Sequence, residues 1–343
     1  MRNVYEFIEK YKRLSIIGME KNVGKTTLLN KLINDVGSKK ILGITSIGRD
    51  GEDIDVVTST DKPRIYIRRG SIIATGRDCL SKCDITKEIL YVTDFTTPMG
   101  DIVIIRALSD GYVDIAGPSY NKQVKEIISL MENFGSELTI IDGALSRKST
   151  AISDVSDATI LATGAALSLD MLKVVEETKK TVNFLMLEDF KERAEEIKKD
   201  FETVKALYIK RDGSKTYIDV NNSVDLAKKI KENLTDEVEY FCIRGAITEK
   251  IMETFIETRG CFLNLNIIVE DGTKFFIDNG LYNKAKMCGI KFKVLNKINL
   301  LFITCNPHSP LGIDFNKNEF KKRLEEEVSV PVIDVVGDEN EIY

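Results

Sequence analysis

The sequence predicts an α/β protein with a doubly wound, mostly parallel sheet, a β-rich insert and a second α/β domain. Residues 13–30, RLSIIGMEKNVGKTTLLN, combine a short apolar strand, a turn with two glycines and an amphipathic helix. After residue 158, short apolar runs alternate with helix-length periodic segments, as in chains of βαβ units. At 343 residues the chain is long enough for two domains, which we place at 1–212 and 213–343.

The glycine-containing turn has the composition of a phosphate-binding site. Gly18 and Gly24 allow the backbone to turn tightly, and the helix that begins at Gly24 directs the positive end of its dipole to the same place. Lys25 is placed to reach the β- and γ-phosphate oxygens, and the Thr26 hydroxyl is placed to hold Mg²⁺. We expect nucleotide contacts from Gly18, Asn22, Val23, Gly24, Lys25, Thr26 and Thr27.

A second strand, 40–45, is expected to end in the acidic loop S-I-G-R-D-G-E-D. If this strand is parallel to the first, the loop lies beside the phosphates, because doubly wound sheets bind ligands at the carboxyl ends of their strands. A carboxylate of the loop, with Asp50 as the candidate, would then hold Mg²⁺ or position water. A solvated acidic turn explains the same residues, and both alternatives stay open.

Residues 56–118 do not follow a simple βα alternation, because five short β-like runs are separated by Gly, Pro and Asp turns. We interpret them as a β-rich insert in the first domain. Within it, the segment 93–101, T-D-F-T-T-P-M-G-D, is dense in small polar residues. Such a segment suits a substrate or partner loop, but a tight connection between two strands needs the same residues.

A helix capped by Ser119 is followed by E-L-T-I-I-D-G-A, a buried strand that ends in an acid and a glycine. In this Walker B pattern, Asp142 would hold Mg²⁺ through water, and Gly143 would let the γ-phosphate approach. Arg147 and Lys148 follow, either to meet phosphate or as plain surface residues. The predicted catalytic residues are Lys25 and Asp142, and the predicted metal contacts are Thr26, Asp142 and Asp50.

The βαβ series is expected to complete the first domain and to end near 212, where K-R-D-G-S-K supplies turn residues. Its predicted strands are 158–163, 182–187 and 204–209, and its predicted helices are 166–179 and 189–199. From Thr216 the α/β alternation restarts without a second phosphate loop, so this half should recognise a substrate or partner. Its most site-like stretch is Asn306-Pro307-His308-Ser309-Pro310, which we interpret as a rigid turn rather than a site.

Composition narrows the class of protein. A net charge of −5 does not favour nucleic acid as a partner, and no apolar run has membrane-spanning length. The start, MRNVYEFIEKYKR, lacks the apolar stretch of a signal peptide, so we expect a cytoplasmic protein. Six scattered cysteines indicate reduced thiols, although Cys79 and Cys83 have a spacing that a metal or redox pair would also use. A single histidine, His308, argues against a Ser/His/Asp site or a multi-histidine metal centre.

The phosphate loop has the spacing G-x5-G-K-T, one residue longer than G-x4-G-K-[ST], because Met19 stands where the common pattern needs glycine. This longer form resembles the loop of dethiobiotin synthetase and its relatives in the MinD class of P-loop proteins. Glu20 stands where MinD-like members carry their signature lysine, and Lys21 is displaced by one position. The dimer-reaching lysine of MinD is therefore not carried over to this chain.

The run from Gly18 to about Leu167 is similar to the ATP-binding subunit of the reactivase for lysine 5,6-aminomutase. The resembling stretches are the phosphate loop, I-L-G-I-T-S-I-G-R-D-G-E, T-D-F-T-T-P-M-G-D, A-G-P-S and T-I-I-D-G-A-L-S-R-K-S. The resemblance implies an Mg²⁺-dependent ATPase that works with a MutS-like subunit to release damaged cobalamin from an inactivated cobalamin-dependent aminomutase. The base-off motif D-x-H-x-x-G is absent around His308, so cobalamin would reside on the partner.

Two other function classes stay open. A dethiobiotin-synthetase-like ATP-dependent ligase is supported by the longer phosphate loop. A nucleotide-dependent metal or cofactor chaperone would use Cys79, Cys83 and the acidic loop. The sequence does not distinguish ATP from GTP, because no base-reading motif such as N-K-x-D follows the late strands.

Overall fold

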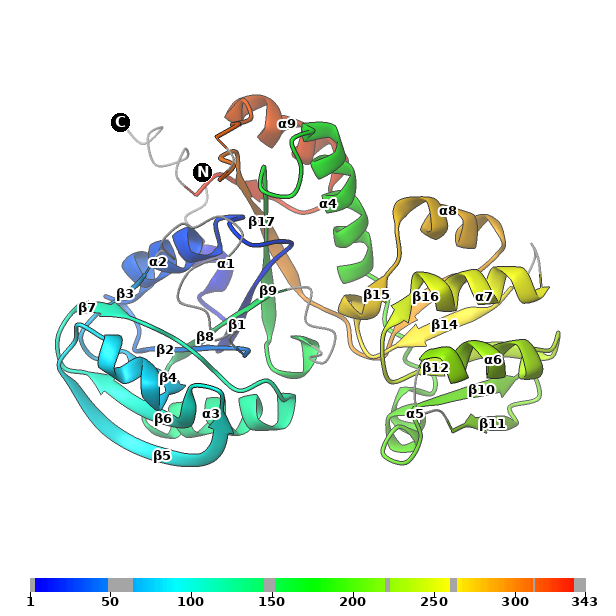
Figure 1. Cartoon of the computed structure of the whole chain (residues 1–343), viewed down its shortest axis with the longest axis horizontal. Helices are drawn as coiled ribbons and strands as arrows, with labels where there is room; N and C mark the ends of the chain where they lie inside the picture. Colours follow the sequence, from blue (N-terminus) through cyan, green and yellow to red (C-terminus); the bar gives the residue numbers. More distant parts are fainter. Residues whose placement is uncertain are drawn as a thin grey trace. The chain divides into compact units, whose positions relative to one another are not determined.

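The structure is a computed structural model and describes residues 4–48, 64–144, 152–219, 223–259, 264–310 and 312–335. Figure 1 shows the helices and strands of this part of the chain. Its α-helices are α1 (Val4–Ile8), α2 (Lys25–Val36), α3 (Asn121–Asn133), α4 (Met171–Leu185), α5 (Ala194–Asp200), α6 (Ser223–Asn233), α7 (Glu249–Arg259), α8 (Asn279–Met287) and α9 (Lys317–Glu327). None of these helices is long and apolar enough to cross a membrane.

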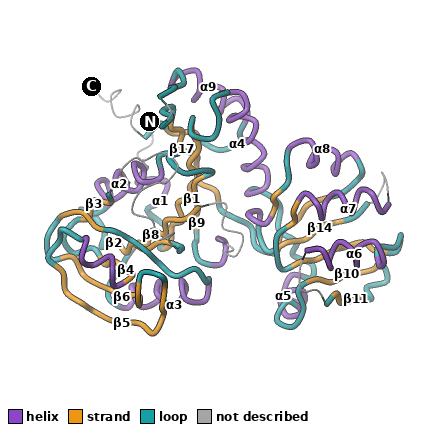
Figure 2. Tube along the Cα trace, in the orientation of Figure 1, coloured by secondary structure: helices purple, strands orange, loops and turns teal. Residues whose placement is uncertain are grey.

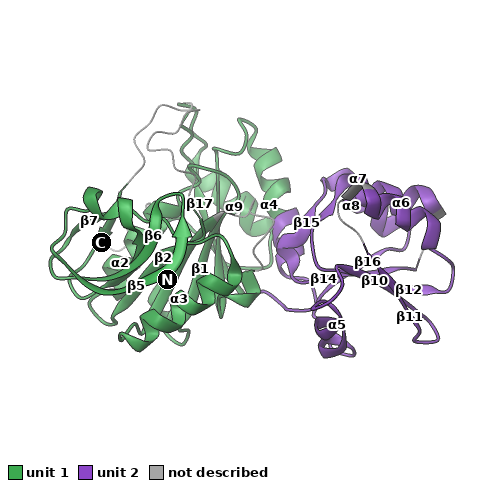
Figure 3. Ribbon diagram, turned by 60° about the horizontal axis from the view of Figure 1, so that its bottom comes forward, with its two compact units in different colours: residues 1–179, 299–343 green, residues 180–298 purple. Residues whose placement is uncertain are grey.

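The chain forms two compact units, and the second is inserted into the first (Figure 3). Unit 1 comprises Met1–Lys179 and Asn299–Tyr343, and unit 2 comprises Lys180–Ile298. This division differs from the predicted boundary at 212. The apolar run 182–187, predicted as a strand, lies mostly in the last turns of α4, because a short apolar run has the same composition in a strand and in a buried helix.

Unit 1 is built on a nine-stranded, mostly parallel sheet with the order β18-β17-β9-β1-β8-β2-β4-β6-β5. Its strands are β1 (Arg13–Gly18), β2 (Leu42–Ser46), β4 (Ile72–Gly76), β5 (Lys87–Thr97), β6 (Gly100–Ala107), β8 (Leu138–Ala144), β9 (Ala158–Gly164), β17 (Leu300–Asn306) and β18 (Val332–Ile333). All neighbouring strands from β18 to β4 are parallel. The expected α/β class with a large, mostly parallel sheet is therefore confirmed (Figure 2).

The predicted β-rich insert is largely part of this same sheet. Strand β6 pairs antiparallel with β4, and β5 pairs antiparallel with β6 at the edge. The segment 93–101, for which two alternatives were open, mostly continues the β5–β6 hairpin, with Pro98 and Met99 between the strands and Gly100 at φ 82°. A separate two-stranded sheet joins β3 (Ile65–Ile67) to β7 (Gly111–Val113). The structure thus favours the tight connection over a separate partner loop.

Helices cover both faces of the large sheet. Leu28 and Leu32 of α2 pack with Ile16 of β1 on one face, whereas Ile127 and Met131 of α3 belong to a cluster on the other face. The predicted cap at Ser119 is wrong, because α3 begins at Asn121 and has Tyr120 as its cap residue. The apolar residues Val124, Ile127, Ile128 and Met131 of α3 are fully buried, because their helical spacing places them on one face of the helix.

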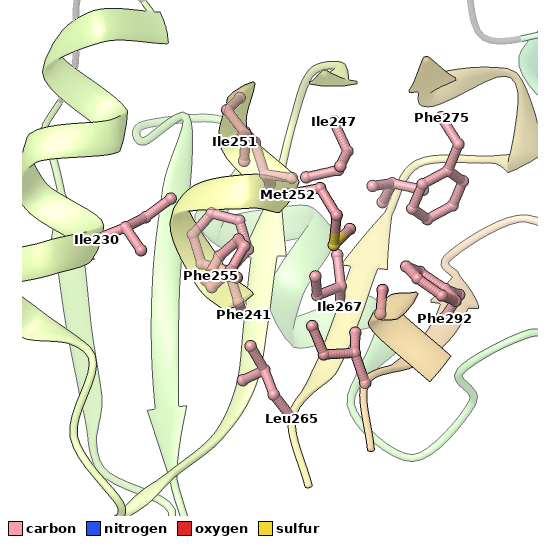
Figure 4. Packing of buried hydrophobic residues seen from close by; sticks show 14 of the residues in the cluster. Ile230, Phe241, Ile247, Ile251, Met252, Phe255, Leu265, Ile267, Phe275 and Phe292 are labelled. Atoms are coloured by element: carbon pink, nitrogen blue, oxygen red, sulfur yellow. The ribbon is translucent and has the colours of Figure 1, made fainter. Parts of the chain in front are cut away.

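Unit 2 contains a five-stranded mixed sheet with the order β11-β10-β12-β14-β16. Its strands are β10 (Ala206–Lys210), β11 (Lys215–Ile218), β12 (Val238–Ile243), β14 (Asn266–Val269) and β16 (Lys291–Val294), and a small parallel pair joins β13 (Ile247–Thr248) to β15 (Phe275–Phe276). Its main buried cluster is rich in aromatic rings, among them Phe241, Phe255, Phe275 and Phe292 (Figure 4). The predicted restart of α/β alternation after Thr216 is correct for β11 to β16, but β17 and β18 join the sheet of unit 1.

Candidate functional site

The predicted phosphate-binding residues lie at the carboxyl end of β1, in a segment that we call the GKT loop (residues 18–26). Strand β1 lies between β8 and β9. The chain leaves β1 for β2, which lies beyond β8, and later passes from β8 to β9 on the opposite side of β1. Loops that diverge in this way leave a crevice at the carboxyl ends of the strands, where open α/β sheets bind their ligands.

The backbone of the GKT loop takes two left-handed conformations. Asn22 has φ 59° and Gly24 has φ 88°, directly before the first turn of α2. Gly24 is the cap residue of this helix and has no side chain that would accept from the first backbone N–H groups. The backbone N–H groups of this first turn, together with the positive end of the helix dipole, can therefore bind an anion.

The side chain of Lys25 lies across the loop. Its Nζ donates to the Glu20 carbonyl oxygen over 3.0 Å, and a Cβ atom built on Gly18 would lie only 2.5 Å from that same Nζ. Gly18 therefore leaves the space that the lysine occupies, which is a steric role beyond the backbone freedom expected from the sequence. The lysine ammonium is thereby held over the loop, where a phosphate group would meet it.

Asp142 lies on β8, directly beside the strand that carries the loop. It is in register with Ile16 of β1 and with Ser46 of β2, and its carbonyl oxygen accepts from the N–H of Ile47 over 2.8 Å. The side chain is half-buried. Since Ile16 is two residues before Gly18, Asp142 and the GKT loop share one end of the sheet, as the sequence pattern predicted.

Of the other predicted site residues, some lie within the described residues and some outside them. Thr26 is half-buried in the first turn of α2, and Thr27 is exposed beside it. Asp50, predicted as a metal contact, lies outside the described residues, and so do Arg147 and Lys148. Among the described residues, no group of three or more His, Cys, Asp or Glu side chains is placed to hold a metal ion. Thr26 and Asp142 carry oxygen atoms of the kind that bind Mg²⁺, a cation that usually keeps several of its waters.

A cavity of about 240 Å³ adjoins the GKT loop. Its wall combines loop residues with the carboxyl ends of β17 and β18, which come from the last part of the chain. The lining residues are Val23, Gly24, Thr27, Thr304, Cys305, Asn306, Pro307, His308, Lys317, Asp334 and Val335. The hydroxyl oxygen of Thr304 is buried and has no hydrogen-bond partner among the described residues, so a buried polar group in this wall is left for a ligand or water.

The stretch Asn306-Pro307-His308-Ser309-Pro310 was predicted to be a rigid turn in a different domain from the phosphate loop. The structure places Asn306 against the loop, because the Asn306 Nδ2 donates to the Asn22 carbonyl oxygen over 3.0 Å. His308 is exposed, and its Nδ1 lies 2.8 Å from Asp314 Oδ2, which lowers the pKa of that carboxyl group. The turn is thus held by its own polar contacts and also lines the cavity.

The cysteine pair does not form a metal site among the described residues. Cys79 is fully buried, and the Cys83 thiol donates to the Cys79 carbonyl oxygen over 3.2 Å. Burial raises the pKa of the Cys83 thiol, which disfavours the thiolate that metal binding needs. No disulfide joins the five cysteines in the described segments.

A scan of protein-family models, a search of curated proteins and a search of solved structures each gave no match to this chain.

Proposed function

We propose that this chain is a P-loop protein of doubly wound topology that binds ATP and Mg²⁺ at the GKT loop and hydrolyses the nucleotide. One observation carries the proposal. A loop with left-handed residues, an uncapped helix N-terminus and a lysine lies at the point where the strand order diverges, next to the strand of Asp142. Phosphate groups are the ligands that this combination recognises best.

Each group has a separate role in this proposal. The first N–H groups of α2 and the Lys25 ammonium would bind the phosphate oxygens, and the lysine would exchange its contact with the Glu20 carbonyl for one with phosphate. Thr26 and Asp142, with Asp50 as a further candidate, would hold Mg²⁺, which supplies positive charge against the charge that develops on the phosphates. Water would attack the γ-phosphorus and the bond to the β-phosphate oxygen would break, giving ADP and inorganic phosphate.

The cavity beside the loop is the best-supported place for the nucleobase. It is contiguous with the loop through Val23, Gly24 and Thr27, and its volume suits part of a ligand rather than a whole one. A nucleotide whose phosphates lie on the GKT loop would therefore extend its base towards Thr304 and Pro307. This placement uses residues that sequence patterns alone did not connect to the nucleotide.

The activity that we propose for the whole chain is the ATPase part of a reactivating factor for a cobalamin-dependent aminomutase, as the resemblance implies. ATP binding and hydrolysis would change the conformation of the chain, and a MutS-like subunit and the aminomutase would be its partners. Unit 2 has a core of its own, so it offers a surface for a partner that is separate from the nucleotide chemistry of unit 1.

Replacing the loop lysine tests nucleotide binding. Lys25→Ala should lower the affinity for ATP at least about 100-fold, because a charge-assisted contact with phosphate is lost. The melting temperature should stay unchanged, since the side chain lies on the loop and not in the core. Lys31→Ala is the matched control, because Lys31 lies on the same helix and pairs with Asp35 over 3.3 Å. Equal affinity of the Lys25→Ala variant and the wild type in a titration with labelled ATP would overturn the site.

A second experiment tests whether an inactivated aminomutase is the protein on which this chain acts. ATP turnover by the chain, together with its MutS-like partner, should rise when inactivated aminomutase is added and should not rise with the active enzyme. A stoichiometric phosphorylated small-molecule product would instead indicate a ligase of the dethiobiotin synthetase type. Nucleotide-dependent binding of a transition metal that disappears in Cys79→Ser and Cys83→Ser variants would indicate a chaperone.

A further inference from the structure

Asn306 ends strand β17 and connects it to the GKT loop. Its Nδ2 donates to the Asn22 carbonyl oxygen over 3.0 Å, and its Oδ1 accepts from the backbone N–H of His308 over 3.2 Å. Both ends of the side-chain amide are thus engaged. A side chain fixed at both ends holds its partners at defined positions, so Asn306 links the loop to the turn after β17.

At the other end of this contact, Asn22 has a left-handed backbone conformation, which few residues other than glycine adopt. With φ 59° it is one of only two described residues other than glycine with a positive φ. Its side chain is exposed, so packing in a core does not impose the conformation. Left-handed residues with a side chain persist where the surroundings fix them, and they concentrate at ligand sites. The hydrogen bond from Asn306 is a contact that fixes the backbone of Asn22 directly.

Two glycines make room for Asn306. A Cβ atom on Gly24 would lie 3.3 Å from the Cβ atom of Asn306, and one on Gly164 would lie 2.6 Å from the Asn306 carbonyl oxygen. That oxygen also accepts from the N–H of Ala165 over 2.9 Å. Asn306 is therefore seated between the GKT loop and the end of β9, with little freedom to move.

We propose that Asn306 is a positioning residue that holds the GKT loop in its phosphate-binding conformation, and that it does so through the backbone of Asn22. The inference rests on the proposed nucleotide function and deepens it. Strand β17, whose last residue Asn306 is 284 residues from Asn22 in sequence, would then control the conformation of the phosphate-binding loop.

The primary test compares two ligands, ATP and inorganic tripolyphosphate, which has no base. Asn306→Ala should lower the affinity for each of the two ligands about tenfold, because the loop that binds the phosphates loses its fixed conformation. A loss for ATP alone would mean that Asn306 contacts the base, and unchanged affinity for both ligands would mean that it has no role. Either result overturns the proposal.

A rescue experiment separates positioning from direct contact. Asn22→Gly should restore the affinity of the Asn306→Ala variant to within about threefold of the wild type, because glycine adopts φ near 60° without strain. Failure of this rescue overturns the route through Asn22. Asn299→Ala is the matched control, since Asn299 precedes the same strand and its Nδ2 donates to the Tyr11 hydroxyl and the Asp157 carbonyl. This variant should bind both ligands as the wild type does.

Hydrogen exchange of the ligand-free protein gives a readout that does not depend on nucleotide. In Asn306→Ala, the amides of residues 19–28 should exchange about tenfold faster than in the wild type and in Asn299→Ala. Unchanged exchange overturns the positioning role even if ATP binds. Faster exchange in a protein that binds neither ATP nor tripolyphosphate would keep the positioning role and remove the nucleotide function instead.

Discussion

Both units contain parallel strands, but different kinds of residue lie at the carboxyl ends of these strands. In unit 1, the ends of β1, β9 and β17 carry glycines and an asparagine beside a cavity. In unit 2, the ends of β12 and β14 carry Arg244 and Glu270, with their charged groups 3.9 Å apart, and Lys274 is buried 3.8 Å from Glu270. These three charged groups thus lie close enough to attract one another. Small residues leave room beside these strand ends in unit 1, whereas the corresponding ends in unit 2 carry charged side chains that lie close to one another.

The comparison also holds for the interiors. The main cluster of unit 2 packs aromatic rings against one another. Phe184 and Phe275 are stacked with 4.8 Å between ring centroids, and Phe241 and Phe255 meet edge to face at 4.9 Å. The clusters of unit 1 that lie against its large sheet are mostly aliphatic. Because an aromatic ring buries a large apolar surface, we expect the stability of unit 2 to depend on a few large side chains.

The largest expected effect is therefore in the core of unit 2. Phe255 is fully buried, and Phe255→Ala should lower the free energy of unfolding of unit 2 by about 3–5 kcal/mol, because a large cavity replaces the ring. ATP affinity should be unchanged, since all described residues of the site belong to unit 1. Urea unfolding of the full chain measures the free energy of unfolding, and a titration with labelled ATP measures the affinity. Met287→Ala, at a residue that is 82% exposed, is the control and should change stability by less than about 0.5 kcal/mol.

The next effect is on catalysis in unit 1. Asp142→Asn should reduce ATP turnover about 100-fold, equivalent to about 2.7 kcal/mol on the barrier, and should raise the Mg²⁺ concentration needed for half-maximal rate. Its effect on stability should be small. Asp154→Asn is a matched control, because Asp154 lies near the surface 3.7 Å from Lys125. Unchanged hydrolysis in Asp142→Asn would exclude this carboxylate from the reaction.

A pair of hydroxyl deletions compares the two units directly. Thr304 in unit 1 and Tyr208 in unit 2 each have a buried hydroxyl without a hydrogen-bond partner in the described segments. Thr304→Val and Tyr208→Phe should each stabilise their unit by about 1 kcal/mol, because an unpaired buried polar group is removed. Only Thr304→Val should also lower the affinity for ATP, by about tenfold, because Thr304 lines the cavity proposed for the base. Its affinity for tripolyphosphate, which has no base, should be unchanged. Equal ATP affinities for the two variants would show that the cavity does not bind the base.

Local patterns predicted the elements of the candidate site that are contiguous in sequence. The GKT loop, α2 and the strand of Asp142 each lie within one short segment, and their residue types carry the signal. The pairing of β17 with β9 was beyond such reasoning, because a parallel strand needs only apolar composition and no local turn to join a distant neighbour. The apolar run before Asn306 is typical of a buried strand, but it does not indicate which sheet that strand joins.

The misplaced domain boundary has the same origin. Once residues 182–187 are assigned as a strand, the alternation continues without a break and the inserted unit merges with the first domain. In the structure, residues 182–185 belong to α4. This assignment depends on packing that the sequence does not show, since Phe184 and Leu185 are both buried. Cavity residues such as Thr304 and Asp334 were missed for the same reason, since only the tertiary fold brings β17 and β18 to the loop.

The smallest effect concerns an ion-pair cluster on unit 2. Hydrogen bonds from Arg193 and then from Lys215 lower the pKa of Glu196 from 4.5 to about 2. Because the pKa is lower in the folded protein, this stabilisation is present above about pH 4.5 and is lost as the pH falls towards 2.

The side chain of Glu196 is 44% exposed, so solvent screening limits the contribution to below about 1 kcal/mol. Glu196→Gln should lower the stability of unit 2 slightly at pH 7 and flatten its pH dependence between 4.5 and 2, as measured by urea unfolding at several pH values. High salt should shrink the difference from the wild type. A variant with the same pH dependence as the wild type would show that these hydrogen bonds of Glu196 do not stabilise unit 2.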